Sequence, residues 1–124
     1  MSWTPAELDA IGGAEELRIA SRRPDGRLRP AATVWVVRVG DDLLVRSAYG
    51  RGNGWFRRAE AAGEGRVAAG GVERDVRFDD ADPADHEAVD AAYRAKYAGQ
   101  PPQHVAPVVS PESWTATFRL VPIG

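Results

Sequence analysis

A glycine-rich loop between a predicted strand and a predicted helix, residues 46–58, carries the residue types best suited to chemistry. Such a loop leaves unpaired backbone amides at the start of the helix, and these amides can bind a phosphate or a carboxylate. Ser47 can add a hydroxyl, and four guanidinium groups can add positive charge. The alternative is a structural turn with solvated arginines, because the strict spacing of a phosphate-binding loop is absent. The arginines are Arg46, Arg51, Arg57 and Arg58.

Other kinds of chemistry have little support in the composition. The chain has no cysteine, which excludes disulfide bonds, thiolate metal sites and a thiol nucleophile. Its two histidines, His86 and His104, are isolated in the sequence, so we predict no metal site. Glu73 and Asp75 share one side of a predicted strand. We interpret that side as solvated or facing a partner chain, with a catalytic carboxylate as the alternative.

The charge balance bears on partners and location. The 124 residues include 16 Lys and Arg against 18 Asp and Glu, which gives a net charge of −2. This balance offers no excess positive charge for nucleic acid or for an acidic membrane surface, and we expect neither as a partner. The first residues lack a basic stretch followed by an apolar one, and no later run approaches membrane-spanning length. We therefore expect a cytoplasmic protein.

Extended runs surround the glycine-rich loop. Alternating apolar and β-branched residues predict one strand over 33–39, a turn at 40–42 and a hairpin partner over 43–47. After the loop, a helix is predicted over 55–62 and ends at Gly63. Further strands are predicted over 17–21, from about Leu28, over 66–69, 72–78 and 114–121.

Two more helices are predicted. Thr4 to Glu7 has the form of a capping box, with a helix to about Ile11. Asp82-Pro83 begins another helix, which runs to Gly99 with an apolar stripe of Val89, Tyr93 and Tyr97. Residues 100–111 contain four prolines and are predicted to be a structureless connection, which in a small domain is a binding loop, a lid or a segment ordered by an oligomer.

These elements predict a mainly β fold of the α+β class. Six or seven short strands, mostly connected by hairpins, are expected to close on themselves and hide their edges. The result is a small antiparallel β-barrel with peripheral helices. A chain of this length fits one domain, residues 1–124.

Several segments resemble a known superfamily. The runs 35–39 (WVVRV), 44–47 (LVRS), 54–55 (GW) and 70–76 (GGVERDV) resemble a small bacterial domain family of unknown function in the flavin-binding split β-barrel superfamily. Residues 31–71 also resemble the neighbouring deazaflavin-dependent nitroreductases, whereas the likeness to the small family covers most of the chain. The resemblance implies a split barrel, a deazaflavin coenzyme or FMN as cofactor, and a homodimer with the site between two subunits.

The resemblance also implies a set of site residues. In the nitroreductases, the strand-end serine, the glycine loop and the tryptophan-led helix frame the coenzyme, with basic side chains near its phosphate. Two positions depart from that pattern: Tyr49 stands where a second glycine is usual, and Arg58 where the helix usually carries an asparagine. The residues that correspond to the cofactor site are Ser47, Tyr49, Gly50, Asn53, Trp55, Arg57 and Arg58, with Thr33 and Trp35 as wall residues on the neighbouring strand.

Three functions are consistent with these observations. The first is a deazaflavin- or flavin-binding oxidoreductase that reduces a small organic acceptor and needs no catalytic side chain of its own, because the cofactor carries the hydride. The second, prompted by Tyr49 and Arg58, is a non-catalytic dimeric barrel that binds another anionic ligand or none. The third is a barrel that stacks single-stranded nucleic acid on Trp35, Tyr49 and Trp55, although the basic surplus is missing.

Overall fold

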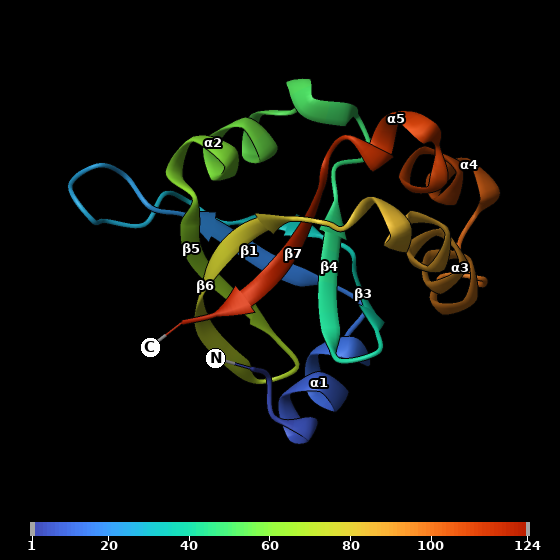
Figure 1. Ribbon diagram of the computed structural model, residues 1–124, viewed down its shortest axis with the longest axis horizontal. Helices are drawn as coiled ribbons and strands as arrows, with labels where there is room; N and C mark the ends of the chain where they lie inside the picture. The colour runs from blue at the N-terminus through green and yellow to red at the C-terminus, as the bar shows by residue number, and fades with distance from the viewer. Residues whose placement is uncertain (1, 124) are drawn as a thin grey trace.

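The computed structural model describes residues 2–123, and its centre is one antiparallel sheet of seven strands (Figure 1). The strands follow the spatial order β2-β1-β5-β6-β7-β4-β3. Chain neighbours β3 and β4 form a hairpin, as do β5 and β6, and β7 is inserted between β6 and β4. The strands are β1 (Leu17–Ser21), β2 (Ala32–Val34), β3 (Val36–Val39), β4 (Asp42–Arg46), β5 (Glu64–Ala69), β6 (Val72–Asp80) and β7 (Thr117–Pro122).

The two edges of this sheet belong to one continuous segment. Strands β2 and β3 lie at opposite ends of the strand order, yet only Trp35 separates them in the chain. Val34 pairs with Leu17 of β1, whereas Val36 pairs with Val45 of β4. Because one residue cannot span an open sheet, the sheet curls until its edges meet, and it is nearly closed. The predicted small antiparallel barrel is confirmed, but the prediction of one strand over 33–39 is wrong, since the chain changes partner at Trp35.

Helices lie at the two ends and on one side of the barrel (Figure 1). Helix α1 (Pro5–Gly12) lies at one end and begins with the predicted capping box of Thr4 and Glu7. Helix α2 (Gly54–Ala62) lies at the other end and stops at Gly63, whose φ is 75°. On the side are α3 (His86–Lys96), α4 (Pro102–Val105) and α5 (Pro111–Trp114), and short 3-10 turns cover Gly50–Gly52, Pro83–Asp85 and Ala106–Val109.

Three boundaries differ from the predictions. Residues 100–111 are not structureless, because Pro102, Pro107 and Pro111 each occupy an early position of a short helical turn, where the missing N–H costs nothing. Trp114 ends α5 and is not part of the closing strand, which begins at Thr117. The predicted strand near Leu28 is only a single bridge to Arg22.

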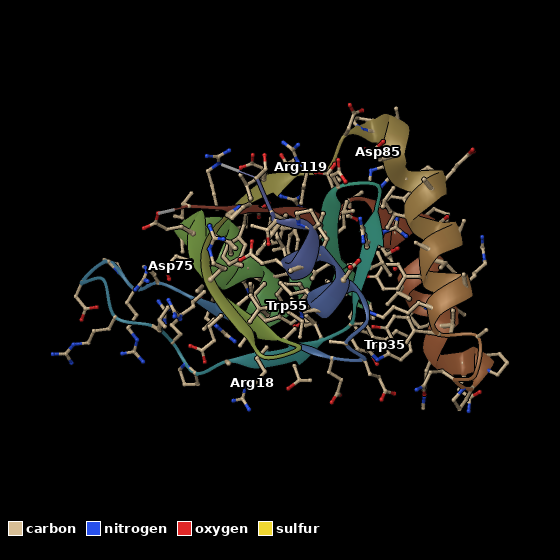
Figure 2. The ribbon with its side chains drawn as sticks, turned by 90° about the horizontal axis from the view of Figure 1, so that it is seen from below. Arg18, Trp35, Trp55, Asp75, Asp85 and Arg119 are labelled. Atoms are coloured by element: carbon tan, nitrogen blue, oxygen red, sulfur yellow. The ribbon has the colours of Figure 1, made fainter. Side chains whose placement is uncertain are left out.

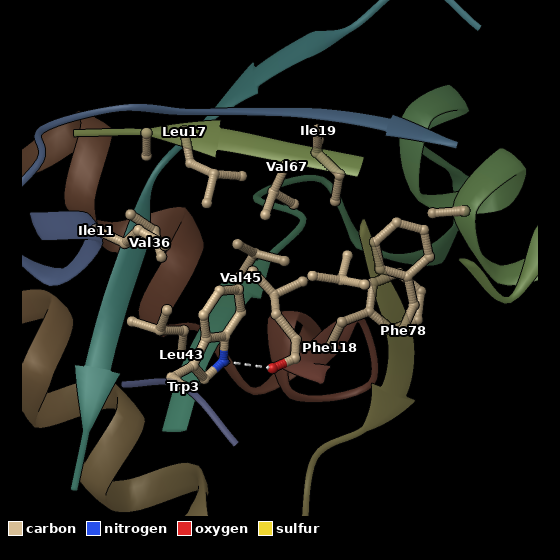
Figure 3. Close-up of a cluster of buried hydrophobic side chains, with 14 of the residues drawn as sticks. Trp3, Ile11, Leu17, Ile19, Val36, Leu43, Val45, Val67, Phe78 and Phe118 are labelled. Atoms are coloured by element: carbon tan, nitrogen blue, oxygen red, sulfur yellow. Dashed lines mark hydrogen bonds between the residues drawn. The ribbon is translucent and has the colours of Figure 1, made fainter. Parts of the chain in front are cut away.

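Alternation along the strands produces two apolar cores. One core fills the barrel, where Phe118 stacks on Phe56. In this core the indole of Trp3 donates a 2.9 Å hydrogen bond to the Leu120 carbonyl (Figure 3). The other core lies between the outer face of β3 and β4 and the stripe of α3, which is the role predicted for that stripe. Its buried members are Val37, Leu44, Val89, Tyr93, Tyr97 and Val108.

The charged side chains on one side of β6 form ion pairs. Asp75 accepts hydrogen bonds of 2.9 Å from both Arg22 and Arg66, and these guanidinium groups hold the pKa of its carboxyl below the usual range. Glu73 lies 3.3 Å from Arg66. The arrangement is a surface network across neighbouring strands. Over the described residues, no helix is long and apolar enough to cross a membrane.

Candidate functional site

The glycine-rich loop leads into α2 without a side-chain cap. Strand β4 ends at Arg46, and Gly50, with φ of 74°, opens a 3-10 turn that ends at Gly52. Asn53 then takes the N-cap position of α2 in an extended conformation, but its side chain makes no capping hydrogen bond. The first amides of α2 therefore remain open to an acceptor from another source, as the sequence indicated.

One cavity on this loop has aromatic walls. We call it the aromatic cavity; its volume is about 280 Å³. Trp35 contributes a wall from the β2–β3 break, and Trp55 contributes one from the first turn of α2. Tyr49, which is 78% exposed, lies at the same cavity. The lining residues are Glu16, Thr33, Val34, Trp35, Arg46, Ala48, Tyr49, Asn53, Trp55, His104 and Val108.

A second cavity runs along α2 and is lined by arginines. We call it the basic cavity; it has a volume of about 570 Å³ and is lined by α2 and by residues of the 22–29 turn. That turn projects from the barrel beside α2 (Figure 1). Gly54, which borders this cavity, lies in the chain between Asn53 and Trp55 of the aromatic cavity, so the first turn of α2 borders both. Five arginines oppose one carboxylate in this lining: Arg22, Arg23, Arg29, Arg57 and Arg58 against Glu64.

Two of these arginines crowd the positive end of α2. A Cβ at Gly54 would lie 3.0 Å from Nη1 of Arg58, so that guanidinium folds back against the helix start and glycine leaves the room for it. Arg57 is in the same first turn. Within residues 2–123, neither arginine has an ion-pair partner. Positive charge at a helix N-terminus is unfavourable, and an anion bound there relieves it.

Arg46, by contrast, has a structural role, because its side chain bonds only to other protein groups. Its guanidinium is fully buried and pairs with Asp90 of α3, and it donates 2.9 Å and 3.1 Å hydrogen bonds to the carbonyls of Val108 and His86. Its Nε donates to Thr117 Oγ1 at 3.0 Å. Every donor is directed to protein, so Arg46 borders the aromatic cavity without offering it a charge. Arg51 is likewise engaged, with Glu60 and the Thr115 carbonyl.

The nine predicted cofactor residues fall into three places. Thr33, Trp35, Tyr49, Asn53 and Trp55 line the aromatic cavity. Arg57 and Arg58 line the basic cavity. Ser47 and Gly50 are buried and line neither cavity. Ser47 Oγ has no hydrogen-bond partner among the described residues, which is unusual for a buried hydroxyl.

Several lining residues were not expected from the sequence. Glu16, His104 and Val108 join the aromatic cavity, the last two from the 100–111 segment that we predicted as a binding loop, a lid or a segment ordered by an oligomer. Arg22, Arg23 and Arg29 reach the basic cavity from the first turn. Their number in a short stretch was visible in the sequence, but nothing there indicated that this turn lies beside α2.

The side chains around Trp35 connect the aromatic cavity to α3. The indole of Trp35 stacks on the ring of Tyr97 with a centroid distance of 4.0 Å and an interplanar angle of 7°. Figure 2 shows Trp35 on the side of the barrel that faces this helix. His86, buried against Trp114, has its pKa lowered by burial and by the nearby charge of Arg46. Among the residues described, no three His, Cys, Asp or Glu side chains gather as a metal site.

Comparison with solved structures defines the fold. The chain superposes on a protein of unknown function from Agrobacterium tumefaciens with a TM-score of 0.68 at 14% identity, covering 98% of this chain and 56% of that one. It also superposes on an F420 reductase with a TM-score of 0.61 at 15% identity, covering 94% of this chain and 93% of that one. A third match is a conserved hypothetical protein from Mycobacterium tuberculosis, with a TM-score of 0.64 at 13% identity, covering 98% of this chain and 82% of that one. At these identities the likeness shows a common fold.

Comparison of sequences defines the family. No curated protein matches the chain. A family model does match, over residues 7–120, and it describes an uncharacterized protein conserved in bacteria. The matched range includes the whole glycine-rich loop, α2 and the strands that carry the cavity walls. This agrees with the small bacterial family that the sequence resembles, and the chain belongs to the DUF2255 family.

Proposed function

We propose that this protein binds a flavin or deazaflavin coenzyme and uses it to reduce a small organic acceptor. The observation that carries the proposal is the pair of cavities at the first turn of α2, one with aromatic walls and one with arginines. A coenzyme with a flat ring and an anionic tail needs both kinds of surface side by side. The F420 reductase among the structural neighbours supports the same class of ligand, since F420 is a deazaflavin.

The aromatic cavity suits a flat ring. Trp35, Trp55 and Tyr49 supply aromatic surface, and Thr33 and Asn53 supply polar groups that can orient the edge of a ring. Its volume of about 280 Å³ is close to the lower limit of typical ligand pockets, so part of a ligand would extend beyond it. Tyr49, which is largely exposed, can close over a bound ring without disturbing the core.

The basic cavity suits a phosphate or carboxylate tail. Arg57 and Arg58 have no ion-pair partner among the described residues, and the adjacent amides at the start of α2 lack a side-chain cap. Arg23 and Arg29 can contact the same anion from the opposite wall. Ser47, whose hydroxyl we predicted as one of the anion-binding groups of the loop, is buried and does not line this cavity, so in this proposal the arginines hold the tail without it.

The bound coenzyme would supply hydride transfer, and the chain would supply position and exclusion of water. Trp35 is held in place by its stack on Tyr97, which fixes one wall of the cavity. Arg46 is fully engaged by protein groups, whereas the side chains of Glu16 and His104 in this lining make no hydrogen bond or ion pair within the described residues and could contact an acceptor. The homodimer that the resemblance implies remains part of the proposal, with a second copy covering Tyr49.

Thermal shift with two cofactors tests the proposal. The purified protein is titrated with FMN and, separately, with the oxidised deazaflavin coenzyme. At a ligand concentration about 100 times the dissociation constant, linkage gives about 2.7 kcal/mol of stabilisation, a shift of several degrees for a domain of this size. Arg58→Ala should weaken the shift, whereas Arg27→Ala, in the exposed turn outside both cavities, should not. No shift with either cofactor would contradict the proposal.

One alternative is supported by a specific observation. The basic cavity is about twice as large as the aromatic one, and its arginines can bind any small phosphate or carboxylate without a redox role. In that case inorganic phosphate would stabilise the protein through Arg57 and Arg58, and neither cofactor would add to the effect. The thermal-shift titration, repeated in the presence of inorganic phosphate, therefore separates the two functions.

A further inference from the structure

The single lysine of the chain has unusual surroundings. Lys96 is the only lysine among 16 basic Lys and Arg residues, and it is the last residue of α3. Its Nζ donates a 2.6 Å hydrogen bond to the carbonyl of Val36 and lies 5.2 Å from the centre of the Tyr97 ring. Among the described residues, no carboxylate lies within ion-pair distance of this amine. The amine is thus held in place without a counter-ion.

The amine also borders a cavity of its own. The cavity has a volume of about 360 Å³, and we call it the lysine cavity. Its one carboxylate, Glu15, accepts a 2.8 Å hydrogen bond from Gln100 and so is directed to that side chain. The stacked pair of Trp35 and Tyr97 stands between this cavity and the aromatic one. The lining residues are Gly13, Glu15, Lys96, Tyr97, Gly99 and Gln100.

We propose that Lys96 is a covalent attachment site for small uncharged aldehydes, which it binds as imines inside the lysine cavity. An amine that borders a cavity and lacks a carboxylate partner is the arrangement that makes lysine a nucleophile. Glu15, and Glu16 beside it, place negative charge near the cavity and disfavour anionic aldehydes. The proposal is independent of any coenzyme in the other two cavities.

The reaction balances with no other reactant. The neutral amine attacks the carbonyl carbon, and one amine proton moves to the carbonyl oxygen to give a carbinolamine. Loss of water, which removes the second amine proton and the hydroxyl, leaves a C=N bond. The Val36 carbonyl keeps a second donor within reach, because Tyr97 Oη lies 3.2 Å from that oxygen and its single proton, donated at 2.7 Å to the Glu15 carbonyl, can turn toward it.

The surroundings of Lys96 favour the neutral form of its amine, which is the form that reacts. Burial lowers the pKa of the Lys96 amine to about 8, partly opposed by the charge of Glu15. Near pH 7.5 its neutral fraction is therefore roughly 200 times that of an ordinary exposed lysine. The cavity walls restrict access, so we expect a smaller advantage, on the order of tenfold or more, in the observed rate.

The test is reductive trapping with an internal reference. The Arg27→Lys variant adds one exposed lysine in the first turn, where the arginine side chain is 84% exposed. The variant is incubated at pH 7.5 with propionaldehyde and cyanoborohydride, and adducts at each lysine and at the α-amine are quantified by peptide mass spectrometry. We expect Lys96 to be labelled at least about ten times faster than the introduced lysine, with a rate that levels off above pH 8. Equal or slower labelling of Lys96 overturns the proposal.

Two further variants test the position of the adduct and the charge preference of the cavity. Lys96→Arg keeps a donor to Val36 and should lose the adduct while leaving the α-amine adduct unchanged. Glu15→Gln keeps the hydrogen bond to Gln100 but removes a charge that raises the pKa of Lys96, so it should increase labelling by both propionaldehyde and the anionic aldehyde glyoxylate. The increase should be larger for glyoxylate, and an equal increase for the two aldehydes would contradict the charge preference. If glyoxylate labels the unmodified protein at Lys96 as fast as propionaldehyde does, the preference for uncharged aldehydes is wrong.

Discussion

Arg46 of β4 and Asp90 of α3 form an ion pair in which the guanidinium is completely buried. The pair attaches the helical side of the molecule to the barrel, because the same guanidinium also donates to groups in β7 and in the Ala106–Val109 turn. Asp90 in turn accepts a 3.0 Å hydrogen bond from the indole of Trp114. Charges buried in this way are costly when one partner is removed.

The first prediction concerns this pair. Asp90→Ala should lower the free energy of unfolding by about 3–5 kcal/mol, because it leaves a buried guanidinium without a counter-charge. The double variant Arg46→Met with Asp90→Ala should be less destabilised than the sum of the two single variants, since no unpaired charge remains. Urea denaturation of the four proteins measures the coupling. Strict additivity would mean that the pair does not act as a unit.

The second prediction concerns His86 and pH. Burial and Arg46 lower the pKa of His86 in the folded state from 6.5, so the unfolded chain binds its proton first as the pH falls. The stability due to neutral His86 is therefore complete above pH 6.5 and is lost as the pH falls from there to the folded pKa. His86→Gln should flatten the pH dependence of the urea midpoint in this window. His104→Gln, at an exposed position, is the matched histidine substitution against which the change in slope is compared.

The β2–β3 break shows where sequence reasoning about the fold stops. Alternation in residues 33–39 correctly indicated extended backbone, and the capping box, Gly63 and the stripe of α3 were all predictable from local chemistry. The change of partner at Trp35 depends on the closure of the whole sheet, which is not a local property. The short turns in 102–114 were missed because proline was taken as a breaker, although it also begins helical turns.

The residues of the candidate site that are close together in the sequence were predictable, whereas those that only the folded structure brings together were not. The glycine-rich loop after β4 predicted a binding site at the first turn of α2, and five of the nine predicted residues line one cavity there. Arg46 and Ser47 belong to the same stretch, but alternation on β4 and the contact with α3 bury them. Arg23 and Arg29 approach α2 only through the pairing of β1 with β5, which follows α2 in the chain.

The third prediction concerns the turn between β5 and β6. Gly70 and Gly71 both have positive φ, but a Cβ at Gly70 would lie 2.2 Å from the carbonyl oxygen of Ala10 in α1, whereas a Cβ at Gly71 meets nothing within 4 Å. Both alanine substitutions should destabilise the fold through φ, and Gly70→Ala should cost about 1–3 kcal/mol more because α1 must move. Thermal unfolding measures the difference. Equal losses would show that the approach of α1 to this turn contributes nothing.

The fourth prediction asks whether one ligand spans the two cavities beside α2. FMN and riboflavin share the ring and differ by the phosphate, so they separate the basic cavity from the aromatic one. Arg58→Ala should weaken FMN about tenfold or more, the loss expected for a charge-assisted hydrogen bond, and leave riboflavin unchanged. Tyr49→Ala should weaken both ligands by about three- to tenfold, because it removes aromatic surface at the ring and, at 78% exposure, leaves the fold intact. Titration calorimetry of the unmodified protein and the two variants gives the six affinities, and the deazaflavin coenzyme can be compared with its phosphate-free chromophore in the same way. Should Arg58→Ala weaken riboflavin as much as FMN, the phosphate is not in the basic cavity and the two cavities serve different ligands.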